Sequence, residues 1–308
     1  MNIKKYMRIL KVILRKSLLK SAKCLSKISP IFASRLLFLI YMKQKLDLKN
    51  PKTLNEKIMW LKLNTYRDNP LVTQCTDKVQ VREYVKSLGL AHILVPLLGV
   101  WSDANEIAWE KLPNSFVIKC NHGCGYNIFC PDKSKQDLKY MEQQLNIWLR
   151  TAFWHEFAEI NYRHIYPMIL CEEYLINENN EPPDDYKVYC FNGEVKFILL
   201  CVGRSKDNLR FYFFDKNWEL ARINPDSLTA SEDFFIPKPS QLDNMIKYAG
   251  VLSKPFPFVR VDFYLLGTKL YFSEMTFTPA AGLDTKRLPE TDLMFGEMVD
   301  LNYSGELK

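Results

Sequence analysis

Hydrophobic and polar positions repeat with two different periods along the chain, and this separates predicted helices from predicted strands. Helical spacing of apolar residues covers residues 3–28, 51–90, 134–160 and 239–254. Shorter apolar runs, which are typical of strands, occupy residues 116–120, 168–175, 186–192, 194–202, 209–215, 258–265 and 270–277. Because helices and strands are mixed without strict alternation, we expect an α+β or mixed α/β fold.

Two short connections contain turn-forming residues. Asn192-Gly193 separates two predicted strands and predicts a tight hairpin. Residues 121–127, Asn-His-Gly-Cys-Gly-Tyr-Asn, follow the predicted strand that ends near Lys119 and precede a short apolar run at 127–130. A lysine at a strand end beside a glycine loop can hold phosphate oxygens through its charge and through backbone N–H groups. A simple turn is the alternative interpretation of the same glycines.

The charge of the chain is concentrated at one end. The 308 residues have a net charge of +7, with 47% hydrophobic and 25% charged positions, which is the composition of a folded globular protein. Residues 1–50 hold 13 Lys and Arg against one acid, Asp47, and so have a charge of +12, whereas the remaining 258 residues have a charge of −5. This distribution argues against a nucleic-acid groove in the main fold.

Residues 1–45 are predicted to form a basic amphipathic helical region. Its longest strongly apolar run, residues 31–42, includes Arg35 and is too short to cross a membrane, and no secretory signal pattern is present. Contact with an anionic membrane surface or a partner, and packing on its own domain, both remain open. The eight scattered cysteines are most simply reduced thiols of a cytoplasmic protein.

The hairpin predicted near the end of the chain gathers four polar side chains. Because side chains alternate along a strand, Arg260 and Asp262 share a face, and so do Glu274 and Thr276. A loop with an odd number of residues, centred on Thr268, would place the two acids opposite each other and the arginine opposite the threonine. The other face would then collect Val259, Val261, Phe263, Leu265, Tyr271, Met275 and Phe277.

This polar face is a candidate metal site. Two facing carboxylates repel each other unless a positive charge lies between them. Oxygen ligands on a rigid sheet suit Mg²⁺, which binds carboxylates together with substrate phosphates. Asp262 and Glu274 are therefore candidate metal ligands, and a solvated face with Arg260 as the counterion is the alternative.

A third candidate lies between the glycine loop and the hairpin. The acidic strand end at residues 172–175, Glu-Glu-Tyr-Leu, is followed by Asp185 and Lys187. Such a strand end can bind the amine and ribose of a nucleotide, and the lysine can reach its phosphates. A surface turn with ordinary charges is the simpler alternative.

In chain order, these features resemble the ATP-grasp superfamily over about residues 50–285. More narrowly, the segments PKTLNEKIMWLKL, TDKVQVREYV, IKCNHGCG and FSEMTFTPAAG are similar to the teichuronopeptide-biosynthesis branch, the TupA-like ATP-grasp family. Most ATP-grasp enzymes have asparagine where this chain has Thr276, which is a departure at one metal ligand.

The resemblance implies an ATP-grasp fold, in which two α+β subdomains clamp ATP, preceded by a helical basic extension. Residues 1–50 would form the basic extension and residues 51–115 a pre-ATP subdomain. Residues 116–171 would form the lid subdomain with the glycine loop, and residues 172–308 the subdomain with the metal site.

The resemblance also implies roles for individual residues. Lys119 and Lys187 would neutralise the ATP phosphates, the loop 121–127 would close over the γ-phosphate, and Asp185 would bind the ribose. The other expected nucleotide ligands are Lys78, His122, Gly123, Gly125, Glu172, Glu173, Tyr174 and Leu175. Asp262, Glu274 and Thr276 would bind Mg²⁺, and Arg260 would stabilise an acyl phosphate or a tetrahedral intermediate. The expected substrate contacts are Arg204, Arg210, Pro279 and Gly282.

The implied activity is an ATP-dependent carboxylate–amine ligase that forms an acyl phosphate. Its substrates would be a saccharide or uronic-acid-containing molecule of a cell-surface polysaccharide, such as a capsule, and an amine or amino acid. Apart from the resemblance, the one-sided charge of residues 1–45 leaves open a peripheral contact with the inner membrane or a polysaccharide assembly machinery. A glycosyltransferase, a sugar phosphotransferase and a non-enzymatic membrane adaptor are the alternatives; the chain has no Asp-x-Asp motif typical of many glycosyltransferases.

Overall fold

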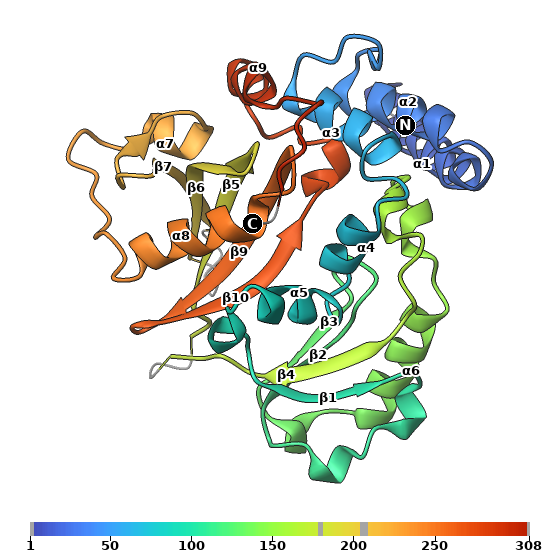
Figure 1. Ribbon diagram of the computed structural model, residues 1–308. Helices are drawn as coiled ribbons and strands as arrows, with labels where there is room; N and C mark the ends of the chain where they lie inside the picture. Colours follow the sequence, from blue (N-terminus) through green and yellow to red (C-terminus); the bar gives the residue numbers. More distant parts are fainter. Residues whose placement is uncertain (1–2, 178–180, 204–208, 307–308) are drawn as a thin grey trace.

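The computed structural model describes residues 3–177, 181–203 and 209–306, with side chains from Val12 onward. Within these residues the chain forms two antiparallel sheets with helices packed around them (Figure 1). The fold is α+β, as the mixed periodicity predicts.

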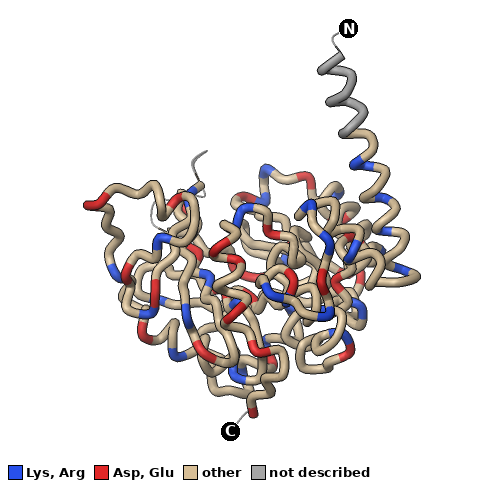
Figure 2. The backbone as a smooth tube through the Cα atoms, turned by 90° about the horizontal axis from the view of Figure 1, so that it is seen from above, with Lys and Arg blue, Asp and Glu red and all other residues tan. Residues whose placement is uncertain are grey.

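A helical hairpin occupies the N-terminal end and consists of α1 (Ile3–Ile28) and α2 (Pro30–Met42). Ser29 caps α2, and Pro30 stands at the first helical position, where the missing N–H costs nothing. Figure 2 shows the described part of α1 leaving the body of the protein. The inner side of the hairpin packs on the body through a small apolar cluster: Ala22, Leu37, Phe38, Leu46, Met59, Ala281 and Leu283.

Three helices connect the hairpin to the first sheet: α3 (Leu54–Leu63), α4 (Pro70–Thr76) and α5 (Val81–Ser87). Thr53 and Glu56 form a reciprocal capping box at the start of α3, which satisfies two of its free N–H groups. All three helices contribute to the core of the second sheet, with Leu54, Ile58, Leu61, Val72, Cys75, Val81, Tyr84 and Val85.

The first sheet has four strands in the order β1-β4-β2-β3. They are β1 (Leu97–Trp101), β2 (Phe116–Cys120), β3 (Asn127–Cys130) and β4 (Ile169–Glu173). Helix α6 (Leu138–Leu149) packs its apolar side against this sheet. The helix expected over 134–160 is shorter than predicted, because the chain after Leu149 forms two single turns, η5 (Phe153–His155) and η6 (Ile160–Tyr162).

The second sheet has six strands in the order β10-β9-β5-β6-β7-β8. They are β5 (Asp184–Phe191), β6 (Glu194–Val202), β7 (Arg210–Asp215), β8 (Leu220–Ala221), β9 (Phe258–Leu266) and β10 (Lys269–Thr276). Helices α8 (Leu242–Ser253) and α9 (Pro289–Met298) pack against it, and the short helix α7 (Pro225–Thr229) lies beside β7. The turn η7 (Pro279–Gly282) follows β10.

The Asn192-Gly193 hairpin is confirmed. Both residues have positive φ, 50° and 74°, and they connect β5 to β6. Two residues with positive φ form the turn that matches the twist of a two-stranded ribbon.

The sequence pattern did not predict β1, α9 or the two short elements β8 and α7. Because β1 pairs with β4, the four-stranded sheet begins within the expected pre-ATP segment of residues 51–115. Helices α3 to α5 share a core with the strands of residues 184–276. The body is therefore organised by the two sheets, which take their parts from distant segments.

Candidate functional site

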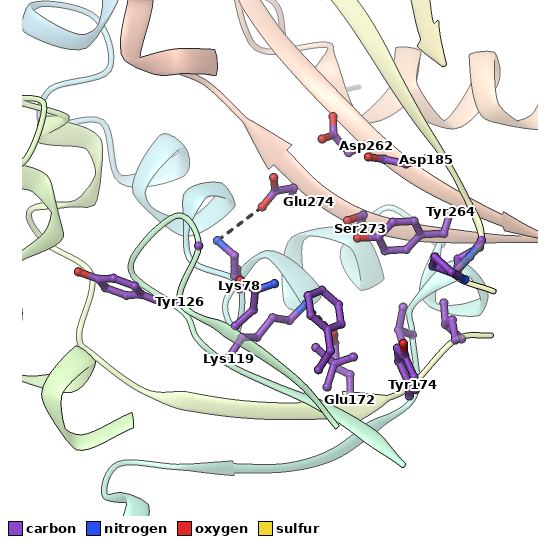
Figure 3. Close-up of a pocket in the computed structure, with 18 of the residues that line it drawn as sticks. Lys78, Lys119, Tyr126, Glu172, Tyr174, Asp185, Asp262, Tyr264, Ser273 and Glu274 are labelled. Carbon is purple, nitrogen blue, oxygen red and sulfur yellow. Dashed lines mark ion pairs between the residues drawn. The ribbon is translucent and has the colours of Figure 1, made fainter. Parts of the chain in front are cut away.

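A cavity of about 620 Å³ lies between the two sheets (Figure 3). The four-stranded sheet and its glycine loop form one wall, and strands β5, β9 and β10 form the other. The charged lining residues are Lys78, Lys119, Glu172, Glu173, Asp185, Lys187, Asp262 and Glu274. The other lining residues are Val95, Val117, Gly123, Cys124, Gly125, Tyr126, Asn127, Phe129, Tyr174, Leu175, Pro182, Pro183, Tyr264 and Ser273.

The hairpin of β9 and β10 pairs Asp262 with Glu274, as predicted, but by a different route. The expected odd loop centred on Thr268 is wrong: the turn has two residues, because Leu266 pairs with Lys269. A bulge between Phe272 and Glu274 then shifts the register by one residue and produces the predicted pairing.

The bulge also changes which residues face the core. Its extra residue, Ser273, lines the cavity together with Glu274. On the turn side of the bulge, Leu270 and Phe272 join the hydrophobic core, whereas Tyr271 was expected there. The error follows from counting strict alternation through a position where the strand is irregular.

Asp262 is buried and bound on both carboxylate oxygens. Arg260 donates from Nε and Nη2, each at 2.7 Å, and Lys187 donates from Nζ at 3.0 Å. Burial opposes the charged form, but Arg260 and Lys187 outweigh it and lower the pKa of Asp262. Lys187 also lies 2.7 Å from Asp185, and these acids raise its pKa against the effect of burial.

Glu274 connects the β9–β10 hairpin to the glycine loop through Lys78. Its Oε1 accepts a hydrogen bond from Thr276 at 3.3 Å, and its Oε2 lies 3.5 Å from the Lys78 Nζ (Figure 3). Lys78 also donates to the backbone oxygen of Gly123 at 3.0 Å. Burial raises the pKa of Glu274, but Lys78 and the nearby cations more than offset it, so the pKa is lowered and the group is anionic.

A buried chain of ion pairs fixes the opposite wall. Lys119 Nζ lies 2.6 Å from one oxygen of Glu172, and Arg82 Nη1 lies 2.8 Å from the other. Arg82 is held in turn by the backbone oxygen of Val95 at 2.8 Å. Burial disfavours the Lys119 ammonium, but Glu172 overcomes this effect and raises the pKa, so Lys119 is a cation inside the cavity.

The glycine loop is anchored from behind. A Cβ at Gly123 would lie 2.7 Å from the Tyr126 ring, so any other residue there would require this ring to shift. The His122 ring does not line the cavity: its Nε2 lies 3.1 Å from the backbone oxygen of Trp148 and 3.2 Å from that of Thr151. Its placement differs from the nucleotide contact expected from the sequence, and the ring ties the loop to the end of α6.

Several predicted site residues lie outside the cavity lining. Arg260 and Thr276 are adjacent to it through their bonds to Asp262 and Glu274. Pro279 and Gly282 form the buried turn η7. Arg210, on β7, pairs with Asp226 at 2.9 Å and is separated from β9 by two intervening strands. Arg204 lies outside the described residues.

Sequence reasoning missed other lining residues. Tyr264 follows Asp262 at strand spacing, so alternation alone would have placed it on the cavity side. Tyr126 and Asn127 belong to the predicted loop and were not singled out. No pattern indicated Arg82, which is 90 residues away from Glu172 in sequence.

The residues present fit a Mg²⁺ ion only if a ligand completes its coordination. Within the residues that the structure describes, no group of three or more His, Cys, Asp or Glu side chains could hold a metal ion. Asp262 and Glu274 are anionic oxygen donors on neighbouring strands, and Mg²⁺ commonly binds one or two carboxylates plus phosphate oxygens. The donor set therefore suits magnesium bound together with a phosphate-bearing substrate.

A cavity between two sheets, with partly buried lysines on both walls and paired acids on one hairpin, is the arrangement of an ATP-grasp protein. Residues 56–300 match the family described as TupA-like ATPgrasp. The match covers most of the chain, and the protein belongs to this family. Comparison with curated proteins gives no match.

Solved ATP-grasp structures resemble this fold at low sequence identity. D-alanine–D-alanine ligase from Bacillus anthracis has a TM-score of 0.42 and 16% identity, with 73% of this chain and 68% of that chain covered. N5-carboxyaminoimidazole synthetase from Staphylococcus aureus, complexed with ADP, has a TM-score of 0.43 and 14% identity over 89% of this chain and 66% of that chain. The chain thus spans about two thirds of these proteins.

Proposed function

We propose that this protein is a magnesium-dependent ATP ligase that joins a carboxylate to an amine. The observation that supports this best is the cavity in which Lys119, on β2, faces the acids of the β9–β10 hairpin. Polyphosphate needs cations on one side and a metal-binding acid pair on the other, and the cavity offers both.

Three lysines would receive the triphosphate. Lys78, Lys119 and Lys187 are each held by a carboxylate that borders the cavity. Binding of ATP would exchange part of these ion pairs for lysine–phosphate pairs, so the lysines are already charged and positioned before ATP arrives. The glycine loop, which Lys78 contacts, would cover the phosphates and exclude water.

Asp262 and Glu274 are the residues that would hold magnesium, with Thr276 beside Glu274. When bound, the ion would neutralise phosphate charge and polarise the γ-phosphoryl group. Arg260 donates hydrogen bonds to Asp262, and these bonds keep the Asp262 carboxylate charged and oriented.

The proposed reaction has two steps. In the first step, a substrate carboxylate oxygen attacks the γ-phosphorus of ATP. The bond between this phosphorus and the oxygen that bridges it to the β-phosphate breaks, so that an acyl phosphate forms and ADP is released. An uncharged amine then attacks the acyl carbon, phosphate departs, and the amine loses a proton to give an amide. The chain need supply no nucleophile, so its contribution is positioning and electrostatic stabilisation.

We further propose a role in cell-surface polysaccharide synthesis, with a saccharide or uronic acid as one substrate and an amino acid or amine as the other, which extends the family membership beyond what the match itself describes. The turn η7 at the end of β10 would face the acceptor. The same fold also accommodates phosphoryl transfer to a sugar hydroxyl, so the reaction itself needs a direct test.

Isothermal titration with Mg-ATP tests the nucleotide site. We expect saturable one-site binding that is lost or weakened at least tenfold in Lys119→Ala. Lys86→Ala is the control, because Lys86 forms only an exposed pair with Glu83. Absence of Mg-ATP binding in the folded wild type, or equal binding by Lys119→Ala, would overturn the proposal.

Hydroxylamine distinguishes the reactions. An acyl phosphate made from a uronic acid and ATP gives a hydroxamate when it is trapped, together with ADP. A sugar phosphate formed instead would identify a phosphotransferase, and UDP or GDP released from a sugar donor, without ADP from ATP, would identify a glycosyltransferase.

A further inference from the structure

The N-terminal hairpin exposes an unusual share of the large apolar side chains. Seven of the seventeen exposed large hydrophobic residues among those described lie between residues 12 and 39, a small part of the chain. They are Val12, Ile13, Leu14, Ile28, Ile31, Phe32 and Leu39. We call this set the apolar surface of the hairpin.

On α2 these residues occupy a face of their own. Phe32 and Leu39, 61% and 51% exposed, share a helical stripe with Arg35. Leu37 and Phe38, on the other side, are buried against the body. The body of the protein therefore covers one apolar side of α2, and the other apolar side is exposed to solvent.

The charge around this surface has one sign. Residues 12–46 contain eight Lys and Arg and no acid. Lys23 is directed to the body, where it pairs with Glu156. Lys16, Lys20, Lys27 and Arg35 are exposed, and in the described part of the chain none of them has an ion-pair partner. Figure 2 shows basic positions and no acidic ones along the described part of α1 that leaves the body.

Apolar side chains surrounded by unpaired cations fit an anionic lipid surface, where the apolar groups enter the headgroup region and the cations meet phosphates. None of the described helices is long and apolar enough to cross a bilayer. The hairpin is also fixed to the body by its own core cluster, so it can act as a rigid docking element.

We propose that the apolar surface of the hairpin, together with its exposed lysines and arginine, docks the protein on an anionic membrane surface. The docking leaves the nucleotide cavity free, because no cavity residue belongs to α1 or α2. It requires neither ATP binding nor ligase activity.

Sedimentation with vesicles tests the proposal in the full chain without nucleotide. We expect binding to phosphatidylcholine vesicles that contain phosphatidylglycerol, at least tenfold weaker binding to phosphatidylcholine alone, and loss of binding as salt is raised. No binding to the anionic vesicles, or equal binding to both, would overturn it.

Two pairs of variants separate the apolar and charged contributions. Phe32→Ser with Leu39→Ser, and Lys16→Glu with Lys20→Glu, should each reduce vesicle binding at least tenfold. The controls change exposed residues elsewhere on the protein: Phe235→Ser with Leu293→Ser, and Lys238→Glu with Lys247→Glu. Controls that lose binding to the same extent would contradict a role of the hairpin.

Two more measurements separate lipid docking from misfolding and from self-association. Thermal melts and Mg-ATP titration of each variant show that the body is folded, independently of lipid binding. Light scattering of the wild type and the Phe32→Ser, Leu39→Ser variant reports self-association. A dimer that the variant dissociates, without vesicle binding by the wild type, would assign the surface to a second copy of the chain and overturn the lipid proposal.

Discussion

Lys62 is a fully buried cation at the base of the turn η7. Its Nζ donates to the backbone oxygens of Phe157 and Ala281, at 2.9 and 3.0 Å. Ala280 and Ala281 have φ of 50° and 58°, a left-handed conformation that alanine adopts only where its surroundings enforce it. Lys62 therefore holds a strained turn that follows directly on the candidate metal strands.

Burial lowers the pKa of Lys62 to about 8, from an ordinary value of 10.5. Between these two pH values the unfolded chain binds a proton that the folded protein has lost, so the free energy of unfolding due to this group rises with pH. Between pH 8 and pH 10.5, we expect the free energy of unfolding of the wild type to rise by up to about 3 kcal/mol relative to that of Lys62→Met. Urea unfolding at several pH values checks this, with Lys86→Met as the exposed control, and parallel curves for wild type and Lys62→Met would contradict it.

Arg82 acts on the cavity through Glu172. Replacing it with methionine leaves a buried carboxylate with Lys119 as its remaining ion-pair partner among the described residues, and should cost about 3–5 kcal/mol of stability. Lys119 would then be held more strongly by Glu172, so Mg-ATP affinity should fall. Urea unfolding and titration measure both effects. Arg67→Met, which breaks an exposed pair with Asp68, should cost less than about 1 kcal/mol.

At the scale of elements, replacing glycine with alanine should have opposite effects on stability in a hairpin turn and in a helix. A Cβ at Gly193 would meet the Tyr303 hydroxyl at 2.6 Å, and its φ is +74°, so Gly193→Ala should destabilise by about 1–2 kcal/mol. Gly250, inside α8, has open space, so Gly250→Ala should stabilise by about 0.5–1 kcal/mol. Thermal melts should shift in opposite directions; a shift of both in the same direction would mean that backbone conformation and free space do not decide the two effects.

The β9–β10 hairpin shows what local pattern can and cannot predict. Alternation of side chains placed Asp262 and Glu274 together, because both must avoid the apolar core. The two-residue turn and the bulge at Ser273 cannot be detected from that pattern. The turn shifts the pairing by one residue from the expected register, and the bulge shifts it back before Glu274. Helix ends were predictable where a cap or proline marks them, as at Pro70, and not where the chain changes to single turns after Leu149.

At the scale of the molecule, contacts between distant segments were beyond sequence patterns. The core of the six-stranded sheet includes residues of α3 to α5, more than a hundred positions earlier in the chain. Arg82 reaches Glu172 in the same way. Lysines and acids could be proposed as candidates because their motifs are local, but their pairing across the cavity depends on how the two sheets are placed.

Lys78 contacts both sides of the cavity, through Gly123 of the loop and Glu274 of β10. Removing this bridge in Lys78→Met should loosen the loop while its backbone bond from Lys78 N to Asn121 remains. We expect amide hydrogen exchange within residues 121–127 to rise about tenfold without nucleotide, which corresponds to about 1.4 kcal/mol of local stability.

Saturating Mg-ATP should restore much of this protection, because the triphosphate replaces the lysine as the link between the glycine loop and the acids of β9 and β10. Lys86→Met, far from the loop in an exposed pair, should leave exchange there unchanged. If the amides of residues 121–127 exchange at the same rate in Lys78→Met and in wild type without nucleotide, other contacts hold the glycine loop in place. The loop then does not depend on the charge of Lys78.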